Sequence, residues 1–489
     1  MKRRLILTCL LALLLSLQPA LADDFDDLGD LADDAGPDAL SEMEEYPAAS
    51  GDDEEESKFT LNIGGYLKAL GYWNEERYSD TLWEDNYNAV YKNQFGKDIP
   101  PAQKINGYNY IGTRLQIQLE AFLEDKARMF SAFNINYNTA HSIHDSSGDN
   151  SSAEQGSIKL VESYIEIYQG NTTWKVGSQL VTWGYMEGIE VPTDRVNARD
   201  YSYKSTEYED SKLPSTGVLL TQHIWDSYLD IMFIPISQVN TNMEFQEYLY
   251  PEESEQVENK PNNGKGAIRF SSSIGNLDFA LSYVEGLDPA PDLIPSTIQD
   301  TGKTDPETGE KIYLVHPTGK QYNRLRSPGL DLQYNFGSVL AKASYINNLT
   351  EDEDGEDKFI KNNWSKYLVG AEFKLGGSTI NFYAGQHLVE NFQDDNASDQ
   401  TNFMMGQLRE RTDFVSGHIN ANFLTGDALN IVLLFAGYWD EESEPVQSNV
   451  KATMTYKLAD GLELVFSPSY MDLLDNIFVD YQCEVKYSF

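Results

Sequence analysis

The sequence of 489 residues contains only two cysteines, Cys9 and Cys483. Cys9 lies in the apolar run at the N-terminus, and removal of that run would leave a single cysteine. A chain with one cysteine can form no internal disulfide. An exported protein of this length must therefore close its fold by other means.

Long apolar runs are also scarce. Beyond the N-terminus, no segment offers the roughly 18 continuous apolar residues that a membrane-spanning helix needs. The N-terminal run, Leu5 to Leu17, follows the basic residues 2–4 and precedes the small residues Ala20 and Ala22. This order is typical of a secretory signal peptide, so we expect residues 1–22 to be removed by cleavage after Ala22.

Basic residues are few, since 36 Lys and Arg face 78 Asp and Glu and give a net charge of −42. Residues 23–57 hold 16 of these acidic residues and no basic one, which predicts an acidic, disordered periplasmic tail. A solvated tail, a periplasmic binding arm, a calcium sink and a plug strand are the alternatives for its role. No basic stripe suggests nucleic-acid binding.

What the sequence does have is strict alternation of apolar and polar residues. In the last stretch, Tyr481, Cys483, Val485, Tyr487 and Phe489 alternate with polar or charged residues. This period of two places the two sets on opposite faces of a strand. The pattern recurs in strand after strand, with a polar face that indicates contact with water and an apolar face that indicates contact with lipid.

From residue 58 onward, pairs of alternating segments meet at short turns rich in Gly, Asn and Asp, and long polar stretches separate the pairs. Short and long connections are expected to alternate strictly. The sequence therefore predicts an all-β fold for residues 58–489, a transmembrane antiparallel up-and-down β-barrel with short periplasmic turns and long extracellular loops. We count 18 strands, or 16 if the weak pair within 217–236 is misassigned.

The final strand resembles the closing strand of Gram-negative outer-membrane barrels, in which a terminal Phe marks barrel closure. Tyr487 and Phe489 carry this resemblance. It implies a location in the outer membrane, with membrane lipids, lipopolysaccharide and the barrel-assembly machinery as partners. The sequence leaves open whether the barrel is a monomer or a homo-trimer.

The predicted inner wall has equal numbers of basic and acidic residues. The basic ones are Lys68, Arg114, Arg128, Lys175, Arg269, Lys342, Lys374, Lys451, Lys457 and Lys486, and the acidic ones are Glu120, Glu162, Glu166, Asp230, Asp278, Asp331, Glu372, Glu463, Asp480 and Glu484. Opposed charges orient polar solutes and set a mild ion preference. The lumen-wall residues we single out are Arg114, Glu120, Glu162, Glu166, Lys175, Gln179, His387 and His418.

The most distinctive internal run is 177–184 (GSQLVTWG), which predicts a strand that ends at an interfacial Trp183. A loop dense in charged residues follows, with Asp194, Arg195, Asn197, Arg199 and Asp200. These side chains could pair with one another or with wall carboxylates and fold the loop inward as a pore constriction. The alternative is an ordinary ordered extracellular loop.

This run resembles a family of large porin-like barrels that is distantly similar to alginate-export porins. In that family a G-x-Q…W-G strand end leads into a D-x-(V/I)-N-P-x-D loop, and Ala198 stands here in place of the proline. The resemblance covers about 162–200 and the closing strand. It implies a porin and leaves the solute undefined.

Catalysis has little support in the sequence. His387 and His418 fall on the polar faces of neighbouring predicted strands, at heights that we estimate as comparable, and Ser416 is two residues from His418. No carboxylate is paired with them, so lumen lining is the preferred interpretation over a Ser/His hydrolase. No phosphate-binding loop or zinc pattern appears, and we predict no enzyme activity, cofactor or metal site.

The sequence thus predicts an outer-membrane porin for diffusion of small polar or organic solutes through a mixed-charge lumen. A sheath barrel that encloses a partner protein, with the acidic tail as docking arm, is the alternative. A hydrolase at the barrel rim comes third.

Overall fold

The computed structural model describes residues 59–77, 107–138, 156–200, 211–240 and 260–489, apart from gaps at 188, 261–262, 295–297, 305–310, 316–318, 376, 394–400, 403–404, 408, 424–427 and 474–475. The predicted signal peptide and acidic tail lie outside the described residues. Within those residues, no helix is long and apolar enough to cross a membrane.

One sheet of 18 strands makes up the body of the fold. Its first half consists of β1 (Phe59–Arg77), β2 (Gly107–Leu123), β3 (Ala127–Asn138), β4 (Gly156–Gln169), β5 (Thr172–Gln179), β6 (Ser215–Ile224), β7 (Ser227–Ile234), β8 (Lys265–Ile274) and β9 (Leu277–Leu287). Its second half consists of β14 (Arg324–Asn335), β15 (Val339–Asn348), β16 (Trp364–Leu375), β17 (Ser378–Val389), β18 (Arg411–Phe423), β19 (Leu429–Trp439), β20 (Pro445–Ala459), β21 (Leu462–Leu473) and β22 (Asn476–Ser488).

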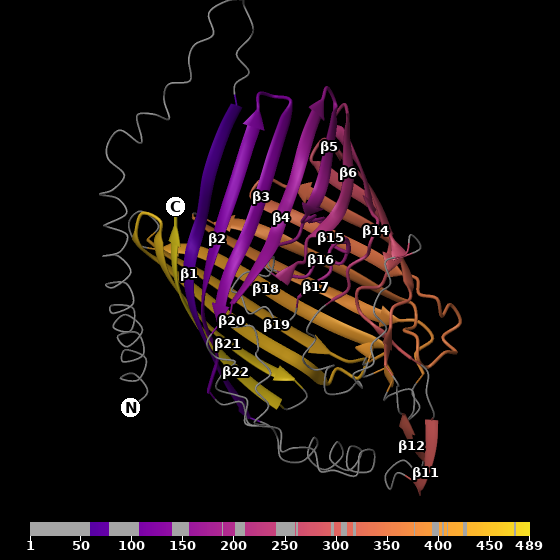
Figure 1. Ribbon diagram of the computed structural model, residues 1–489. Helices are drawn as coiled ribbons and strands as arrows, with labels where there is room; N and C mark the ends of the chain where they lie inside the picture. The colour runs from indigo at the N-terminus through magenta and orange to yellow at the C-terminus, as the bar shows by residue number, and fades with distance from the viewer. Residues whose placement is uncertain are drawn as a thin grey trace, which may run out of the picture. The chain divides into compact units, whose positions relative to one another are not determined.

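The sheet closes on itself because the first strand pairs with the last. β1 is antiparallel to β2 on one side and to β22 on the other, with Tyr66 opposite Ser488. Beyond the end of β22, Gly65 and Phe489 exchange two backbone hydrogen bonds of 3.1 Å. The fold is therefore a closed antiparallel β-barrel (Figure 1). The predicted count of 18 strands is confirmed, including the weak pair β6 and β7.

The connections follow the predicted rhythm with two exceptions. Turns such as 124–126 and 225–226 join strands at one end of the barrel, and most connections at the other end are longer. Two connections at the long end are short, however, because only 440–444 and 474–475 separate their strands. The expectation of strict alternation was wrong there, since antiparallel neighbours need only a tight turn to connect them.

The outer face of the barrel is apolar, as the alternation predicts. Ile158 is 76% exposed, Phe233 57% and Val369 52%, although each lies within a strand. The residues that alternate with this outward set point inward, and the polar ones among them include Glu120, Arg128 and Asp331. A closed barrel leaves no core between sheets for the apolar set, so this set forms the outer surface.

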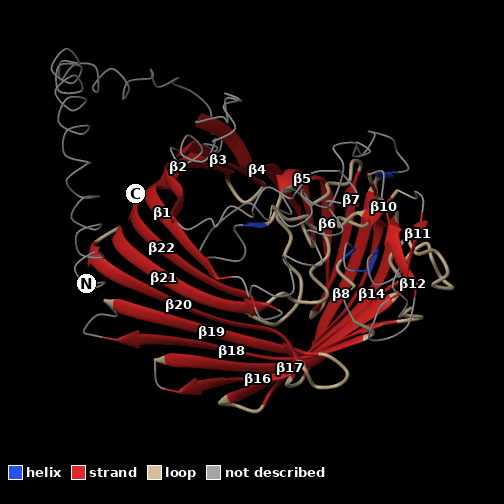
Figure 2. Cartoon of the chain, turned by 90° about the horizontal axis from the view of Figure 1, so that it is seen from below, coloured by secondary structure: helices blue, strands red, loops and turns tan. Residues whose placement is uncertain are grey.

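Two small sheets lie in the connection between β9 and β14. β10 (Asp292–Leu293) pairs with β13 (Lys320–Gln321), and β11 (Ile298–Thr304) pairs with β12 (Lys311–Val315). Seen along the barrel in Figure 2, loops lie within the ring of strands. The side-chain contacts below identify one of them.

Candidate functional site: an inward segment and the lumen wall

The chain that leaves β5 at Gln179 folds into the barrel, and residues 180–200 are called the inward segment. Thr193 Oγ1 donates a hydrogen bond to the Asp331 carboxylate of β14, at 2.8 and 2.9 Å from its two oxygens. The backbone N–H of Glu187 donates to Tyr383 Oη of β17 at 3.3 Å. Asp331 and Tyr383 point inward, so the segment reaches the inner wall of strands far from its own in sequence.

An apolar patch on the inner wall holds the base of the segment, where residues from its beginning and its end lie together. Val181, Trp183 and Val196 of the segment are buried. They pack against inward-facing residues of β7 to β9, which are Met232, Ile234, Ala267 and Val284. Two expectations are corrected here. Trp183 is buried inside the barrel rather than placed at a membrane interface, and this part of the wall is covered by the chain rather than wetted.

Gly184 makes the change of direction possible. Its φ of 104° lies in a region that other residues rarely adopt, and a Cβ at this position would lie 2.3 Å from Val191 Cγ1. Glycine tolerates both conditions because it lacks a side chain. Gly184, the last residue of the GSQLVTWG run, therefore has a structural role in folding the segment back on itself.

Asn197 holds the base of the inward segment. Its Oδ1 accepts the N–H of Val181 at 2.8 Å, and its Nδ2 donates to the carbonyl of Leu213 at 2.8 Å and to Ser215 Oγ at 3.2 Å. Asn197 is itself buried. One amide thus ties both ends of the connection to the start of β6, as a buried amide should when all its groups find partners.

The charged residues predicted beside Asn197 also serve this base. Asp194 Oδ2 is 2.6 Å from Lys212 Nζ and 3.7 Å from Arg199 Nη2, and all three side chains are buried. Asp200 Oδ2 is 3.8 Å from Lys159 Nζ. These pairs fix the backbone, so Asp194, Arg199 and Asp200 are largely used in holding the segment in place.

A second contact holds the far end of the segment. Met186 and Val191 pack against Leu368, Tyr383 and Phe414, which point inward from β16, β17 and β18. The two contacts together join the segment to the inner faces of β7 to β9 and of β16 to β18.

Gly329 leaves room for the contact at Asp331. A Cβ on Gly329 would lie 2.8 Å from Thr193 Cγ2 and 2.6 Å from Ser282 Oγ. Ser344 Oγ also donates to Asp331, at 2.8 Å. This point on β14 is therefore shaped for the threonine of the segment.

Arg195 is the one residue of the predicted set that reaches towards the opposite wall. Its guanidinium carbon lies 5.0 Å from the centre of the Trp364 ring on β16, a cation–π geometry. The edge of the His387 ring also contacts Trp364, with centroids 5.0 Å apart. Within the described residues, Arg195 Nε has no hydrogen-bond partner.

Glu190 and Lys366 complete a mixed-charge cluster around Arg195. Glu190 is 46% exposed, and its Oε2 lies 3.9 Å from Lys366 Nζ. Enclosure by the protein raises the pKa of Glu190, but Lys366, Arg195, Arg199 and His387 lower it by more, so the pKa lies below its ordinary value. The carboxylate stays ionised among cations.

The wall of β2 to β5 is built differently, as a lattice of polar side chains. Arg128 bridges Glu120 at 2.6 Å and Glu166 at 3.1 Å. Arg114 Nε donates to Asn136 Oδ1 at 2.7 Å. These strands therefore satisfy their charges from neighbouring strands at the same height.

The remaining wall residues connect this lattice to the inward segment. Glu162 Oε1 accepts the N–H of Leu180 at 2.7 Å. Lys175 Nζ lies 3.7 Å from the centre of the Tyr164 ring. Gln179 is fully buried, with its Nε2 directed at two backbone carbonyls at 3.4 Å.

The two histidines do not share a site. His387 pairs with Thr412, whereas His418 pairs with Asn381. They are thus six positions apart along β17, about 20 Å at the rise of a strand. The estimate of comparable heights was wrong. It counted residues from the turns next to each strand and assumed that these turns lie at the same level of the barrel.

Three residues of this region escaped the sequence reasoning: Glu190, Thr193 and Lys366. Lys366 and His387 lie directly opposite each other on β16 and β17, and the alternation of β16 could have indicated Lys366. Nothing in the sequence indicates the contacts of Glu190 or Thr193, because both depend on strands over a hundred residues away. In the described parts of the chain, no group of three or more His, Cys, Asp or Glu side chains could hold a metal ion.

No protein-family model matches the sequence, and no curated protein matches it. Solved structures do match the fold. OpdO of Pseudomonas aeruginosa gives a TM-score of 0.52 at 10% identity, over 88% of this chain and 97% of that one. OccK9 (OpdG) of the same organism gives 0.51 at 12% identity, over 88% and 98%. OpdK of that organism, solved with vanillate, gives 0.50 at 8% identity, also over 88% and 98%.

These likenesses carry the fold and no more, because so few residues are shared. They support a β-barrel of the kind found in Occ channels. The likeness to alginate-export porins stays an expectation from the sequence.

Proposed function

We propose that this protein is an outer-membrane channel for small polar or organic solutes, narrowed by the inward segment. The observation that carries the proposal is the position of residues 180–200 inside a closed barrel, anchored on two walls. Barrels of this strand number enclose an aqueous channel unless something fills it. A single segment inside the barrel narrows such a channel.

The two faces of the barrel support the membrane location. Large apolar side chains are exposed on the outer face, whereas a soluble protein rarely exposes so extensive an apolar surface. Such a band suits the hydrocarbon of a bilayer. Membrane lipids and lipopolysaccharide are therefore the partners we expect, together with the barrel-assembly machinery, and a monomer and a homo-trimer both fit.

The structural neighbours support a solute channel. One of them is OpdK, whose structure was solved with vanillate. A small organic anion could approach Arg195 and Lys366 in the present chain, with Glu190 beside them. Opposite charges placed side by side in this cluster orient polar solutes that pass them.

The inward segment also bears on the sheath alternative. A barrel that encloses a partner protein needs a clear interior, and here contacts cross it from β5 to β14, β16, β17 and β18. The channel is therefore the function that the geometry supports best.

Conductance in planar bilayers tests the proposal, with Arg195→Ala as the informative variant. We expect stable open steps for the wild type, a larger conductance for the variant, and a reversal potential shifted towards cations in a salt gradient. Arg195 is chosen because its guanidinium lies between the segment and the opposite wall.

Arg326→Ala is the matched control. Arg326 is on the outward face of β14, where it pairs with Glu353 at 2.9 Å. Its loss should leave conductance and reversal potential unchanged. A folded wild-type barrel that stays electrically silent would contradict the channel.

A further inference from the structure

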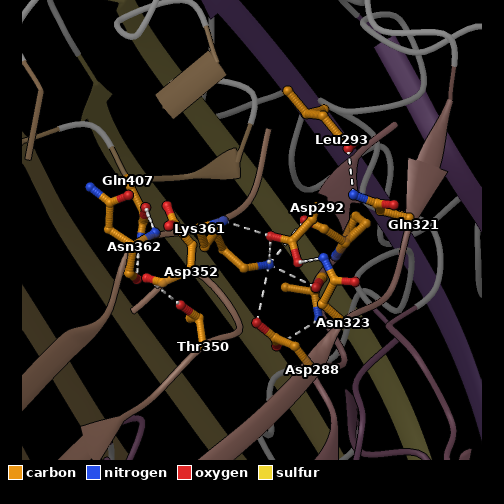
Figure 3. Close-up of polar contacts among 12 residues, drawn as sticks. Asp288, Asp292, Leu293, Gln321, Asn323, Thr350, Asp352, Lys361, Asn362 and Gln407 are labelled. Atoms are coloured by element: carbon orange, nitrogen blue, oxygen red, sulfur yellow. Dashed lines mark hydrogen bonds and ion pairs between the residues drawn. The ribbon is translucent and has the colours of Figure 1, made fainter. Parts of the chain in front are cut away.

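A single buried lysine joins two of the long connections. Lys361 Nζ lies 2.8 Å from the carbonyl oxygen of Ala290, 3.0 Å from that of Pro291, 3.1 Å from Asp288 Oδ2 and 3.3 Å from Asp292 Oδ1 (Figure 3). The side chains of Lys361, Asp288 and Asp292 are at most 5% exposed. These residues are called the Lys361 cluster.

The cluster draws on separate parts of the chain. Residues 288–292 follow β9, whereas Lys361 belongs to the connection between β15 and β16. The backbone N–H of Lys361 also donates to Asp292 Oδ1 at 2.9 Å, and Asn323 Nδ2 donates to Asp292 Oδ2 at 3.0 Å. Asp292 is thus held by groups on either side of β14.

Neighbouring hydrogen bonds extend the cluster to a third connection. Leu293 N–H donates to the carbonyl of Phe359 at 2.9 Å. Asn362 N–H donates to Gln407 Oε1 at 3.0 Å, and Gln407 Nε2 donates back to the carbonyl of Asn362 at 2.9 Å. The connections that contain 288–294, 349–363 and 401–407 therefore form one hydrogen-bonded unit.

This unit continues into the base of the inward segment. Asn240 N–H donates to the carbonyl of Pro289 at 2.8 Å, and Asn240 Oδ1 accepts the N–H of Arg199 at 2.8 Å. A second contact lies nearby, where Lys265 Nζ donates to the carbonyl of Val196 at 3.1 Å. Two hydrogen bonds through Asn240 thus link Pro289 to Arg199 of the inward segment.

The energetics of the cluster depend on Lys361. A buried carboxylate is costly unless it is paired, and removal of one partner of a buried ion pair leaves the other charge uncompensated. Burial lowers the pKa of Lys361, but Asp288 and Asp292 raise it by more, so the pKa lies above its ordinary value. The ammonium is therefore retained, and without it two carboxylates would repel each other and seek water.

The geometry points to Lys361 as a positioning residue for the channel constriction. By fixing residues 288–292, it holds Pro289 against Asn240 and thereby holds Arg199 and the inward segment in the narrowed arrangement. The inference rests on the proposed channel function and adds a control on the steadiness of the opening. Loss of the Lys361 charge should release residues 288–292 and let the inward segment fluctuate.

The test compares single-channel currents of Lys361→Met with those of the wild type in planar bilayers. Methionine keeps most of the length of lysine and removes its charge. We expect current fluctuations between sub-states to become several-fold more frequent, with a higher mean conductance. A purely structural role would lower the unfolding temperature in detergent and leave the current noise of folded barrels unchanged.

Lys358→Met is the matched control, because Lys358 belongs to the same connection and lies outside the contacts of the Lys361 ammonium. It should give wild-type currents. If Lys361→Met fails to fold, the triple variant Lys361→Met, Asp288→Asn, Asp292→Asn removes the stranded charges and should fold, yet it should still show noisy currents.

Two results separate failure of this inference from failure of the channel. A silent wild type overturns the channel function itself. A conducting wild type with quiet, unchanged currents in Lys361→Met, or in the triple variant where only that one folds, overturns the positioning role alone.

Discussion

The inner walls of β2 to β5 and of β6 to β9 come from strands with the same alternating pattern, but their inward side chains have different partners. On β2 to β5, Arg128 is satisfied by Glu120 and Glu166 from its neighbouring strands. On β7 to β9, the inward positions include Met232, Ile234 and Val284, which are covered by the inward segment. The first wall pairs these charges between its own strands, whereas the second needs another part of the chain to cover its apolar side chains.

This difference indicates which parts of the barrel determine the shape of the lumen and which determine its charge. A charge lattice within a wall can change one pair at a time, because each pair is local. An apolar patch commits the barrel to a covering segment, because apolar surface left in water is costly. The apolar patch of β7 to β9 therefore fixes the shape of the lumen, and the charged side chains of β2 to β5 set its charge.

Trp183→Ala should change stability and conductance more than the other variants, and it tests whether the apolar patch holds the inward segment. Truncation of a buried aromatic side chain typically costs about 3 kcal/mol or more, and Trp183 is 3% exposed within the patch. We expect the inward segment to lose its docking, seen as faster hydrogen exchange over 180–200 and as a larger conductance.

Trp174→Ala serves as the control for the same change of residue. Trp174 points outward from β5 and is 37% exposed. Conductance should be unchanged in this variant. Unaltered exchange over 180–200 in Trp183→Ala would show that the apolar patch does not hold the segment.

Arg128→Met should have a smaller effect on stability and a clear one on selectivity. Partly exposed ion pairs contribute about 1 kcal/mol or less, and the Arg128 side chain is 27% exposed. Two carboxylates would then face the lumen without a cation, which favours cations. The reversal potential in a salt gradient and the midpoint of denaturant unfolding measure the two effects.

Arg114→Met sharpens this test, because it removes the same charge. Arg114 Nε donates to the amide oxygen of Asn136. The shift in reversal potential should be similar in the two variants, because each loses one lumen cation. A shift in Arg128→Met alone would contradict an ion preference set by the summed charge of this wall.

The pH dependence of the Lys361 cluster should give the smallest effect. Burial raises the pKa of Asp292 above its usual 3.8, so its contribution to stability falls as pH rises through the raised value. Burial also raises the pKa of Asp288, but Lys361 and Arg195 lower it by more, so its contribution is present above pH 3.8 and is lost below. As pH falls, the contribution of Asp292 to stability therefore rises while that of Asp288 is lost.

Asp292→Asn should therefore expose the dependence of Asp288. We expect the unfolding temperature of this variant to drop more steeply than that of the wild type as pH falls from neutral to below 3.8. Asp354→Asn, on the same connection as Lys361, should follow the wild type. An identical slope in Asp292→Asn and the wild type would contradict opposed contributions.

Most of the barrel could be predicted from the sequence because its determinants are local. The side-chain period of two defines both faces of each strand, and glycine, asparagine and aspartate mark the turns. For the charged run after Trp183, the sequence left an inward fold and an ordinary extracellular loop open, and the roles within the run could not be predicted. Asp194 and Arg199 hold the base, whereas Arg195 reaches Trp364, and only the positions of distant strands separate these roles.

The sequence alone determined that the chain is a β-barrel of 18 strands with an apolar exterior, since alternation and turn chemistry act between neighbours. Tertiary structure decided that Trp183 is buried, that His387 and His418 lie apart, and that Lys361 joins two connections. The physical reason is that these facts depend on contacts between segments far apart in the chain. Such contacts follow from barrel closure and strand register, which no local pattern encodes.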